Sequence, residues 1–281
     1  MVDETTGGRK PASLEVVAGR LKSLWQALTV DGIKILTVTP TVTVETESKL
    51  PATALQIWKF GHNAAVGTAY ETLWTTGGLY PWASWTAWDD ATGSTASLAS
   101  TNAADTSVVV AWEGLGVNGS LVSGTTTTNA SDGTTPVNIA TKLNRLHRAY
   151  RKTAGTTTGD LQISVGGTVV VDIDKDINSS ELTLYTVPLA HTAYLQSFVA
   201  SVDKNADGFV QLMVRPAGDG FKSFTGALTV TGTTTLDYTS NGWSSAPPLA
   251  AGTDIDVRGV KLSGGGSPLM SGNFHLVLIP D

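Results

Sequence analysis

The sequence predicts a mainly β protein: β-sandwich, jelly-roll-like domains preceded by an N-terminal amphipathic helix and an extended arm. Three observations carry this prediction. Segments rich in Val, Ile and Thr run for about five to eight residues between Gly, Asn, Asp or Pro. Only 15% of the residues are charged, against about 25% in a typical domain. Helical spacing of apolar residues is clear only near the N-terminus.

Residues 13–28 predict the helix, with Ser13 as its N-cap and the turn pair Asp31-Gly32 after its end. A helix standing alone would expose its apolar stripe, so we expect this stripe to anchor the chain on a larger particle. The stripe consists of Leu14, Val17, Leu21, Leu24, Trp25 and Leu28.

Residues 33–46 predict an extended arm, because apolar and polar residues alternate along it without a partner strand nearby. We expect the arm to add a strand to a neighbour's sheet. Its anchoring side chains are Ile33, Ile35 and Val38. The predicted division of the chain is an anchor (1–50), a first β-sandwich region (51–155) and a second β-sandwich region (156–281).

Two segments of the β region depart from its pattern. Residues 123–135 lack apolar side chains to bury, so we expect an exposed loop or strand tip. Residues 137–151 fit either a helix, from apolar residues at helical spacing, or a strand over 143–151 with Leu146 and Tyr150 facing a core.

Charge and composition exclude several kinds of partner. The chain has 18 basic and 24 acidic residues and a net charge of −6, so we expect neither nucleic acid nor a membrane as a partner. It has no cysteine, which excludes disulfides and thiolate chemistry. No apolar run approaches the roughly 18 residues of a membrane helix, and the first residues lack a signal-peptide core, so we expect a soluble chain that is not exported.

Three motif matches favour structural interpretations. The glycines at 114–119 have dinucleotide-loop spacing, but no helix follows, so we expect a hairpin loop. Residues 203–208 resemble the start of a calcium loop, yet Val214 stands where a bidentate Glu is needed, so we expect a turn. The basic cluster in 142–152 fits a solvated face or pairing with a neighbouring subunit.

We expect no enzymatic activity, cofactor or metal site. The four histidines do not occur at HxxxH or HExxH spacing, and no GxSxG motif is present. A carbohydrate-active enzyme on a β-sandwich is the alternative from another class, and it is disfavoured by the scarcity of Glu in the β region.

Trp82, Trp85 and Trp88 form a candidate aromatic cluster. An exposed cluster would suit a carbohydrate-binding face or a protein interface, because flat rings provide contact area at small entropic cost. Core packing is the competing interpretation, and we favour it.

The region from about residue 55 to the end resembles a broad group of tailed-bacteriophage virion proteins, namely head fibre, capsid decoration and tail-associated proteins. The phrases that carry the resemblance are "IWKFGHNAAVGTAYETLWTTGG", "LTLYTVPLAHTAYLQSFVASVDK", "FVQLMVRP", "FKSF", "TDIDVRGV" and "GNFHLVLI". Within them we read a strand, a turn at Pro188 and a second strand with Tyr194 facing inward. The resemblance also favours a strand over 143–151.

The resemblance implies a non-enzymatic virion protein, most simply a head decoration (cement) or head fibre subunit. Such proteins are commonly trimeric and attach through an N-terminal segment, so the implied partners are other copies of the chain and the major capsid protein or other virion proteins. The implied location is the virion, assembled in the host cytoplasm. The alternative is a tail fibre or baseplate component that binds host-surface glycans through Trp82, Trp85 and Trp88.

Overall fold

The structure is a computed structural model that describes residues 53–203, 206–224, 228–231, 235–239 and 247–281. The anchor helix and the arm predicted at 13–28 and 33–46 lie outside these residues. All described residues belong to one compact unit, Glu47–Asp281.

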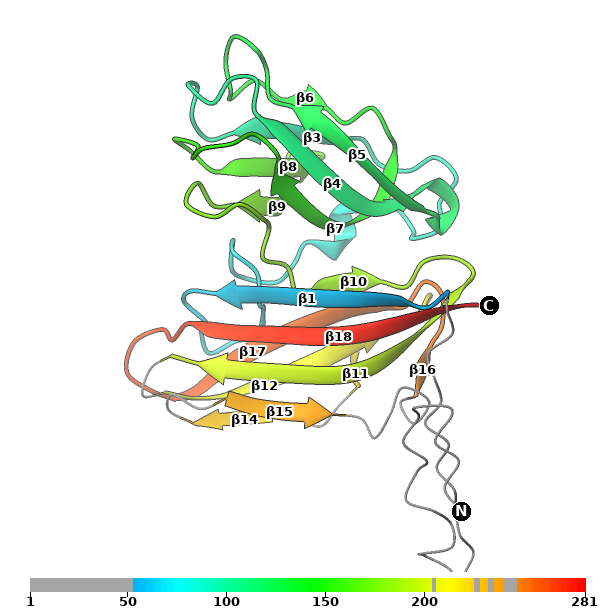
Figure 1. The fold of residues 1–281 in the computed structure, drawn as a ribbon. Helices are drawn as coiled ribbons and strands as arrows, with labels where there is room; N and C mark the ends of the chain where they lie inside the picture. Colours follow the sequence, from blue (N-terminus) through cyan, green and yellow to red (C-terminus); the bar gives the residue numbers. More distant parts are fainter. Residues whose placement is uncertain (1–52, 204–205, 225–227, 232–234, 240–246) are drawn as a thin grey trace, which may run out of the picture. The chain divides into compact units, whose positions relative to one another are not determined.

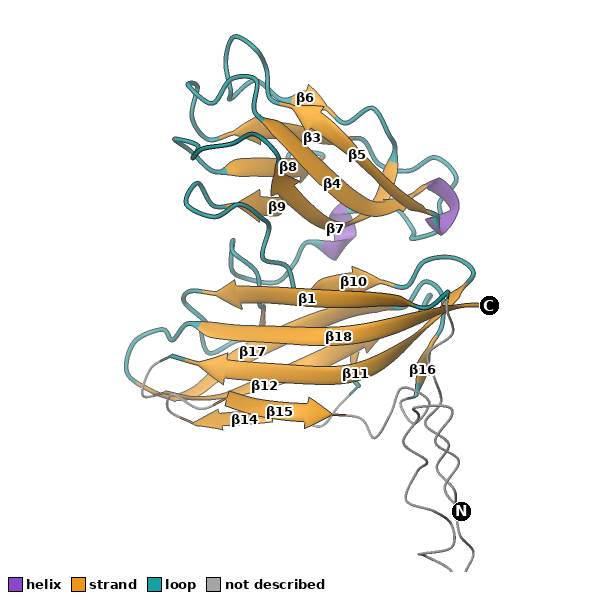
Figure 2. Cartoon of the chain, in the orientation of Figure 1, coloured by secondary structure: helices purple, strands orange, loops and turns teal. Residues whose placement is uncertain are grey.

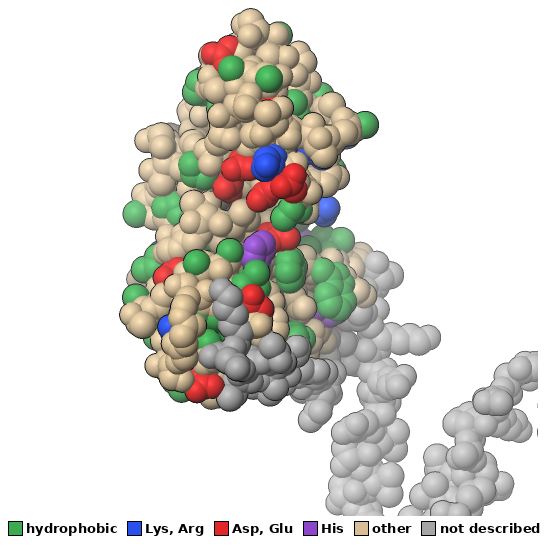
Figure 3. All heavy atoms as spheres, turned by 90° about the vertical axis from the view of Figure 1, so that its left-hand side faces the viewer, with side chains coloured by type: hydrophobic (Ala, Val, Ile, Leu, Met, Phe, Trp, Pro, Cys, Tyr) green, Lys and Arg blue, Asp and Glu red, His purple; other side chains and the backbone are tan. Residues whose placement is uncertain are grey.

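The prediction of a mainly β chain is confirmed, as Figure 2 shows. Among the described residues the only helical elements are the short 3-10 turns η1 (Trp82–Ser84) and η2 (Val117–Gly119). None of the described helices is long and apolar enough to cross a membrane. On the face seen in Figure 3, Lys, Arg, Asp and Glu side chains cover only a small part of the described surface.

Two antiparallel sheets enclose one hydrophobic cluster (Figure 1). The first has the order β1 (Leu55–Asn63), β18 (Met270–Pro280), β11 (His191–Val202) and β15 (Thr235–Thr239), with β16 (Pro248–Leu249) also on β11. The second has the order β10 (Leu184–Thr186), β17 (Asp254–Gly264), β12 (Ala206–Arg215) and β13 (Lys222–Ser223), joined by β2 (Glu71–Thr72) and β14 (Leu228–Thr231). Buried and half-buried residues alternate along β12, as expected for a strand with one face in a core. We call these strands the host module.

Two smaller sheets share a second cluster, which includes Leu98, Trp112 and Ile163. One sheet has the order β6 (Val137–Asn138), β3 (Ala96–Ser100), β8 (Leu161–Val165) and β9 (Thr168–Ile173). The other has the order β5 (Leu121–Thr127), β4 (Val109–Gly116) and β7 (Leu143–Arg151). We call residues 75–181 the inserted module.

The inserted module interrupts the host module in sequence. Strand β2 pairs with β17 before the chain leaves, and β10 pairs with β17 after it returns. Trp74 and Leu182 form an antiparallel bridge where the two crossings meet. Strands from both sides of the predicted boundary near residue 155 therefore share sheets: β1 pairs with β18, and β3 pairs with β8.

Several local predictions can be compared with these strands. Residues 143–151 form a strand, and residues 114–119 lie in the hairpin that joins β4 to β5. Of the two alternatives for 123–135, an exposed loop or a strand tip, the structure has a strand in the first part: 121–127 form β5, whose residues are exposed or half-buried, and pair with β4. Tyr194 does not face inward: it is half-buried, whereas its neighbours Ala193 and Leu195 on the opposite face of β11 are buried.

Candidate functional site

The predicted site residues fall into two groups. The anchoring residues of the helix and arm, from Leu14 to Val38, lie outside the described residues. The three tryptophans do not form an exposed aromatic face, because Trp82 and Trp85 are only 9% and 6% exposed and Trp88 is half-buried. The interpretation of these tryptophans as an exposed cluster is therefore wrong. Trp82 and Trp85 instead pack in the core.

Each tryptophan has a structural partner. The indole N–H of Trp85 donates to the hydroxyl of Tyr80 at 2.9 Å, which satisfies both buried groups. The ring of Trp88 lies over Gly119 and Gly252, where a Cβ would come within 2.5 Å and 2.2 Å of ring atoms. Both glycines also have positive φ, so no other residue fits easily at either position.

A buried ionic network surrounds the third tryptophan, Trp82. Asp254 of β17, 3% exposed, accepts hydrogen bonds from Arg145 Nε at 3.0 Å, from Arg215 Nη2 at 2.5 Å and from the Thr186 hydroxyl at 2.6 Å. The guanidinium groups of Arg145 and Arg215 lie over the Trp82 ring at 5.7 Å and 5.1 Å. Since Arg145 belongs to β7 and Asp254 to β17, the network joins the inserted module to the host module.

Asp256, two residues further along β17, extends the network on the same face of the strand. It is fully buried and accepts hydrogen bonds from Arg258 Nε at 2.8 Å and from the Trp82 indole at 3.2 Å. Burial raises the pKa of Asp256, and the neighbouring Arg258 charge opposes this. The contacts of Asp256 all go to its Oδ2 atom, and its Oδ1 atom has no hydrogen-bond partner among the described residues. Because the charged groups of this network pair with one another, we assign the network a structural role.

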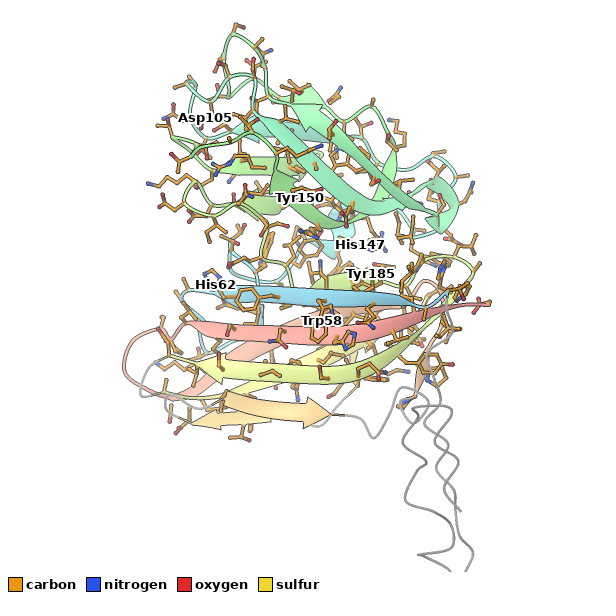
Figure 4. All side chains as sticks on the ribbon, in the orientation of Figure 1. Trp58, His62, Asp105, His147, Tyr150 and Tyr185 are labelled. Carbon is orange, nitrogen blue, oxygen red and sulfur yellow. The ribbon has the colours of Figure 1, made fainter. Side chains whose placement is uncertain are left out.

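A cleft of about 360 Å³ lies along β1 and is the strongest candidate for a functional site. Its walls come from β1, β4, β5, β7 and β10 of the two modules. Figure 4 labels Trp58, His147 and Tyr185, which all line it. The lining residues are Gln56, Ile57, Trp58, Lys59, Glu113, Gly114, Leu121, Val122, Ser123, His147, Arg148 and Tyr185.

A β-bulge shapes one wall of this cleft. Glu113 pairs with Arg148 and Gly114 pairs with Leu146, so His147 of β7 is left without a partner on β4. The backbone carbonyl of His147 instead accepts a hydrogen bond from Lys59 Nζ. Gly114 permits the bulge, because a Cβ there would lie 2.2 Å from the carbonyl oxygen of Arg145.

Lys59 is a buried amine in this cleft, only 8% exposed. Burial and, to a smaller extent, the positive charge of Arg148 lower the pKa of Lys59 to about 7, against the opposing effect of Glu113. The amine therefore exchanges its proton near neutral pH.

His147 and Tyr185 pack together beside Lys59, with ring centroids 4.1 Å apart. Burial lowers the pKa of His147, and its Nε2 accepts a hydrogen bond from the Thr186 amide, so the ring is neutral. Burial and the Glu113 charge raise the pKa of the Tyr185 phenol, which stays protonated. Tyr185 is 3% exposed, and its hydroxyl has no hydrogen-bond partner among the described residues.

An exposed aromatic ring lies at the mouth of the cleft. Trp58 is 65% exposed and stacks on His275 of β18, with centroids 3.9 Å apart and planes 2° from parallel. Phe60 lies two residues further along the same face of β1 and is also exposed. Trp58 and Phe60 therefore form an exposed aromatic surface on β1, whereas Trp82 and Trp85 are buried elsewhere in the chain.

The cleft brings together hydrogen-bond donors, one carboxylate and an aromatic platform. This combination suits binding of a polar ligand. Within the described ranges, no three His, Asp or Glu side chains cluster in a way that could hold a metal ion.

Sequence reasoning missed the cleft for a physical reason. Its residues come from five strands that are distant in sequence: β1 and β10 of the host module, and β4, β5 and β7 of the inserted module. A lysine between Trp58 and Phe60, in a segment otherwise rich in apolar residues, is the local signal that could have indicated the site.

The comparisons with known proteins identify no family. No family model matches the chain, and no curated protein matches it. Two solved structures of infectious bursal disease virus are similar to it, from the Gx strain (8% identity, TM-score 0.26) and the Gt strain (10% identity, TM-score 0.22). Each similarity covers 81% of this chain and 72% of the other chain. At TM-scores this low, neither similarity carries an argument about fold or function.

Proposed function

We propose that the chain is a non-enzymatic structural subunit of a tailed-bacteriophage virion, a head decoration (cement) or head fibre subunit. In this proposal residues 1–50 attach to the major capsid protein or another virion protein, and the β region forms the projecting body. Jelly-roll-like sandwiches and trimeric assembly are part of the same proposal.

One observation carries it: the phrases that resemble phage virion proteins all fall in or beside the host module. They correspond to β1 and β2, to β10 and β11, and to β12, β13, β17 and β18. These strands enclose a single hydrophobic cluster that includes Leu195, Leu212 and Phe274. The resembling phrases therefore belong to one folded unit, the host module. This supports a similarity to phage virion proteins that extends over the whole module.

The attachment can be tested in the full-length chain with two charge substitutions on the predicted stripe. Leu21→Asp with Leu24→Asp should lower binding to undecorated particles at least about tenfold, because two leucines lose apolar burial of several kcal/mol. The matched control is Ser23→Asp with Gln26→Asp on the polar side of the same helix, which should bind as the wild type does. Equal binding by both variants would remove the anchor assignment.

Trimeric assembly is tested by sedimentation equilibrium. We expect a mass close to three times the 29.2 kDa of one chain. A monomer across the accessible concentration range contradicts this part of the proposal.

A tail fibre or baseplate component that binds host-surface glycans is the second candidate. The observation in its favour is the exposed ring of Trp58 beside the cleft, which replaces the buried Trp82 as a carbohydrate-binding residue. Electron microscopy of particles carrying the labelled chain separates the candidates, since label on the shell supports the first and label on the tail supports the second.

A further inference from the structure

We propose that the cleft between β1, β5 and β7 is a binding site for an acidic saccharide, a sugar ring that carries a carboxylate. Its volume of about 360 Å³ lies within the range of roughly 300–1,000 Å³ that is usual for small-molecule sites. The site does not depend on where in a virion the chain resides, so its test is independent of the proposed attachment.

Unsatisfied polar groups in the cleft are the first argument. The Tyr185 hydroxyl is buried and has no hydrogen-bond partner among the described residues. A buried hydroxyl left unpaired costs about 1–3 kcal/mol, and a ligand oxygen at this position would recover that cost. Lys59 Nζ has a hydrogen bond to the His147 carbonyl, and an ammonium group can donate three.

The balance of donors and charge is the second argument. Lys59 and Arg148 provide two cationic groups against the single carboxylate of Glu113. Gln56 and Ser123 add uncharged donors at the walls. Such a lining favours a ligand rich in acceptor oxygens that also carries a negative charge, because charge-assisted hydrogen bonds are the stronger ones.

The aromatic platform is the third argument. Stacking on His275 fixes the plane of the Trp58 ring, so its exposed surface is oriented before a ligand arrives. Sugar rings present flat patches of C–H groups, and an oriented indole offers them contact area at small entropic cost. Trp58, Lys59 and Arg148 all line the cleft, so the saccharide would contact the indole at the mouth while its carboxylate lies near the two cationic groups inside.

Binding of a carboxylate should also depend on pH. The charged and titratable groups that face Lys59 are Arg148 and His147 from β7, Glu113 from β4 and Tyr185 from β10. An anion beside the amine favours its protonated form, so the complex takes up a proton near neutral pH. Affinity should therefore decrease as the pH rises from about 7 toward the ordinary range of lysine, about 10.

The experiment is a titration of the full-length chain, followed by ligand-observed NMR, with D-glucuronate, D-galacturonate and N-acetylneuraminate. D-glucose and D-galactose serve as neutral counterparts of the first two. We expect saturable binding of at least one acidic sugar, and at least about tenfold weaker binding of its neutral counterpart. Equal binding of an acidic sugar and its neutral counterpart, or no binding of any acidic sugar, overturns the proposal.

Variants locate the binding in the cleft. Lys59→Met should weaken binding at least about tenfold and abolish its pH dependence, and Tyr185→Phe should weaken it several-fold. Because these two positions are buried, Trp58→Ala at the exposed platform provides a test that does not threaten folding. Phe60→Ala is the matched control, since Phe60 is exposed on the same strand but does not line the cleft. Loss of binding in Phe60→Ala, or unchanged binding in Trp58→Ala, contradicts the assignment.

Discussion

The buried carboxylate of Asp254 forms ion pairs with two arginines, Arg145 and Arg215. Removing a single member of a buried ion pair typically costs about 3–5 kcal/mol, because the remaining charge is left uncompensated. Asp254→Asn leaves Arg145 and Arg215 without their counter-charge, so we expect a loss of that size in the free energy of unfolding, measured by urea denaturation. Asp176→Asn breaks an exposed pair with Lys175 and should leave stability nearly unchanged. Equal effects would refute the structural role of the network.

A second carboxylate, Asp172 on β9, should make stability depend on pH. Burial, with the charges of Asp160 and Asp174, raises the pKa of Asp172 to about 6. The folded chain then binds this proton more tightly than the unfolded chain, so the contribution to stability is present below about pH 4 and is lost as the pH rises to about 6.

The corresponding variant is Asp172→Asn, which cannot ionise. It should be more stable than the wild type at pH 7, and this advantage should disappear near pH 4, as measured by denaturation at several pH values. Asp89→Asn at an exposed position is the control. A constant difference between Asp172→Asn and the wild type across this range would show that the carboxyl does not titrate as described.

At the scale of elements, the bulge between β4 and β7 depends on Gly114. A methyl group there would meet the Arg145 carbonyl oxygen at 2.2 Å, and forced overpacking of this kind costs about 1–3 kcal/mol. Gly114→Ala should therefore lower the free energy of unfolding by about that amount, as measured by urea denaturation. At Gly220 a Cβ would meet nothing within 4 Å, so Gly220→Ala should change little. Similar losses in both variants would mean that the bulge does not need the glycine.

Sequence patterns predicted the strands well and their assembly poorly. Alternation was sufficient for β12 and β18, where one face of each strand packs in a core. For 143–151 it was ambiguous, because the bulge at His147 breaks the period of two and leaves five consecutive residues buried. The basic cluster misled for a similar reason: Arg145 looks like a surface charge until Asp254, more than one hundred residues away, is placed beside it.

At the scale of the whole molecule, the two modules should unfold together. Both chain crossings are held by the Trp74–Leu182 bridge, and the Arg145–Asp254 pair and the Lys59–His147 hydrogen bond also connect the modules. We therefore expect one calorimetric transition for residues 47–281. Two resolved transitions in the wild type would show that these connections do not couple the modules.

The adjacency of Trp74 and Leu182 has a consequence for how this chain can change over time. Because the outgoing and returning segments are neighbours, the intervening stretch can be lengthened, shortened or exchanged without altering the spacing that the surrounding strands must accommodate. The ion pair of Arg145 with Asp254 and the hydrogen bond of Trp82 with Asp256 would be the main contacts that a replacement has to reproduce. Variation among relatives should therefore concentrate between residues 75 and 181, and the aspartates of β17 should vary together with the arginine and tryptophan that contact them.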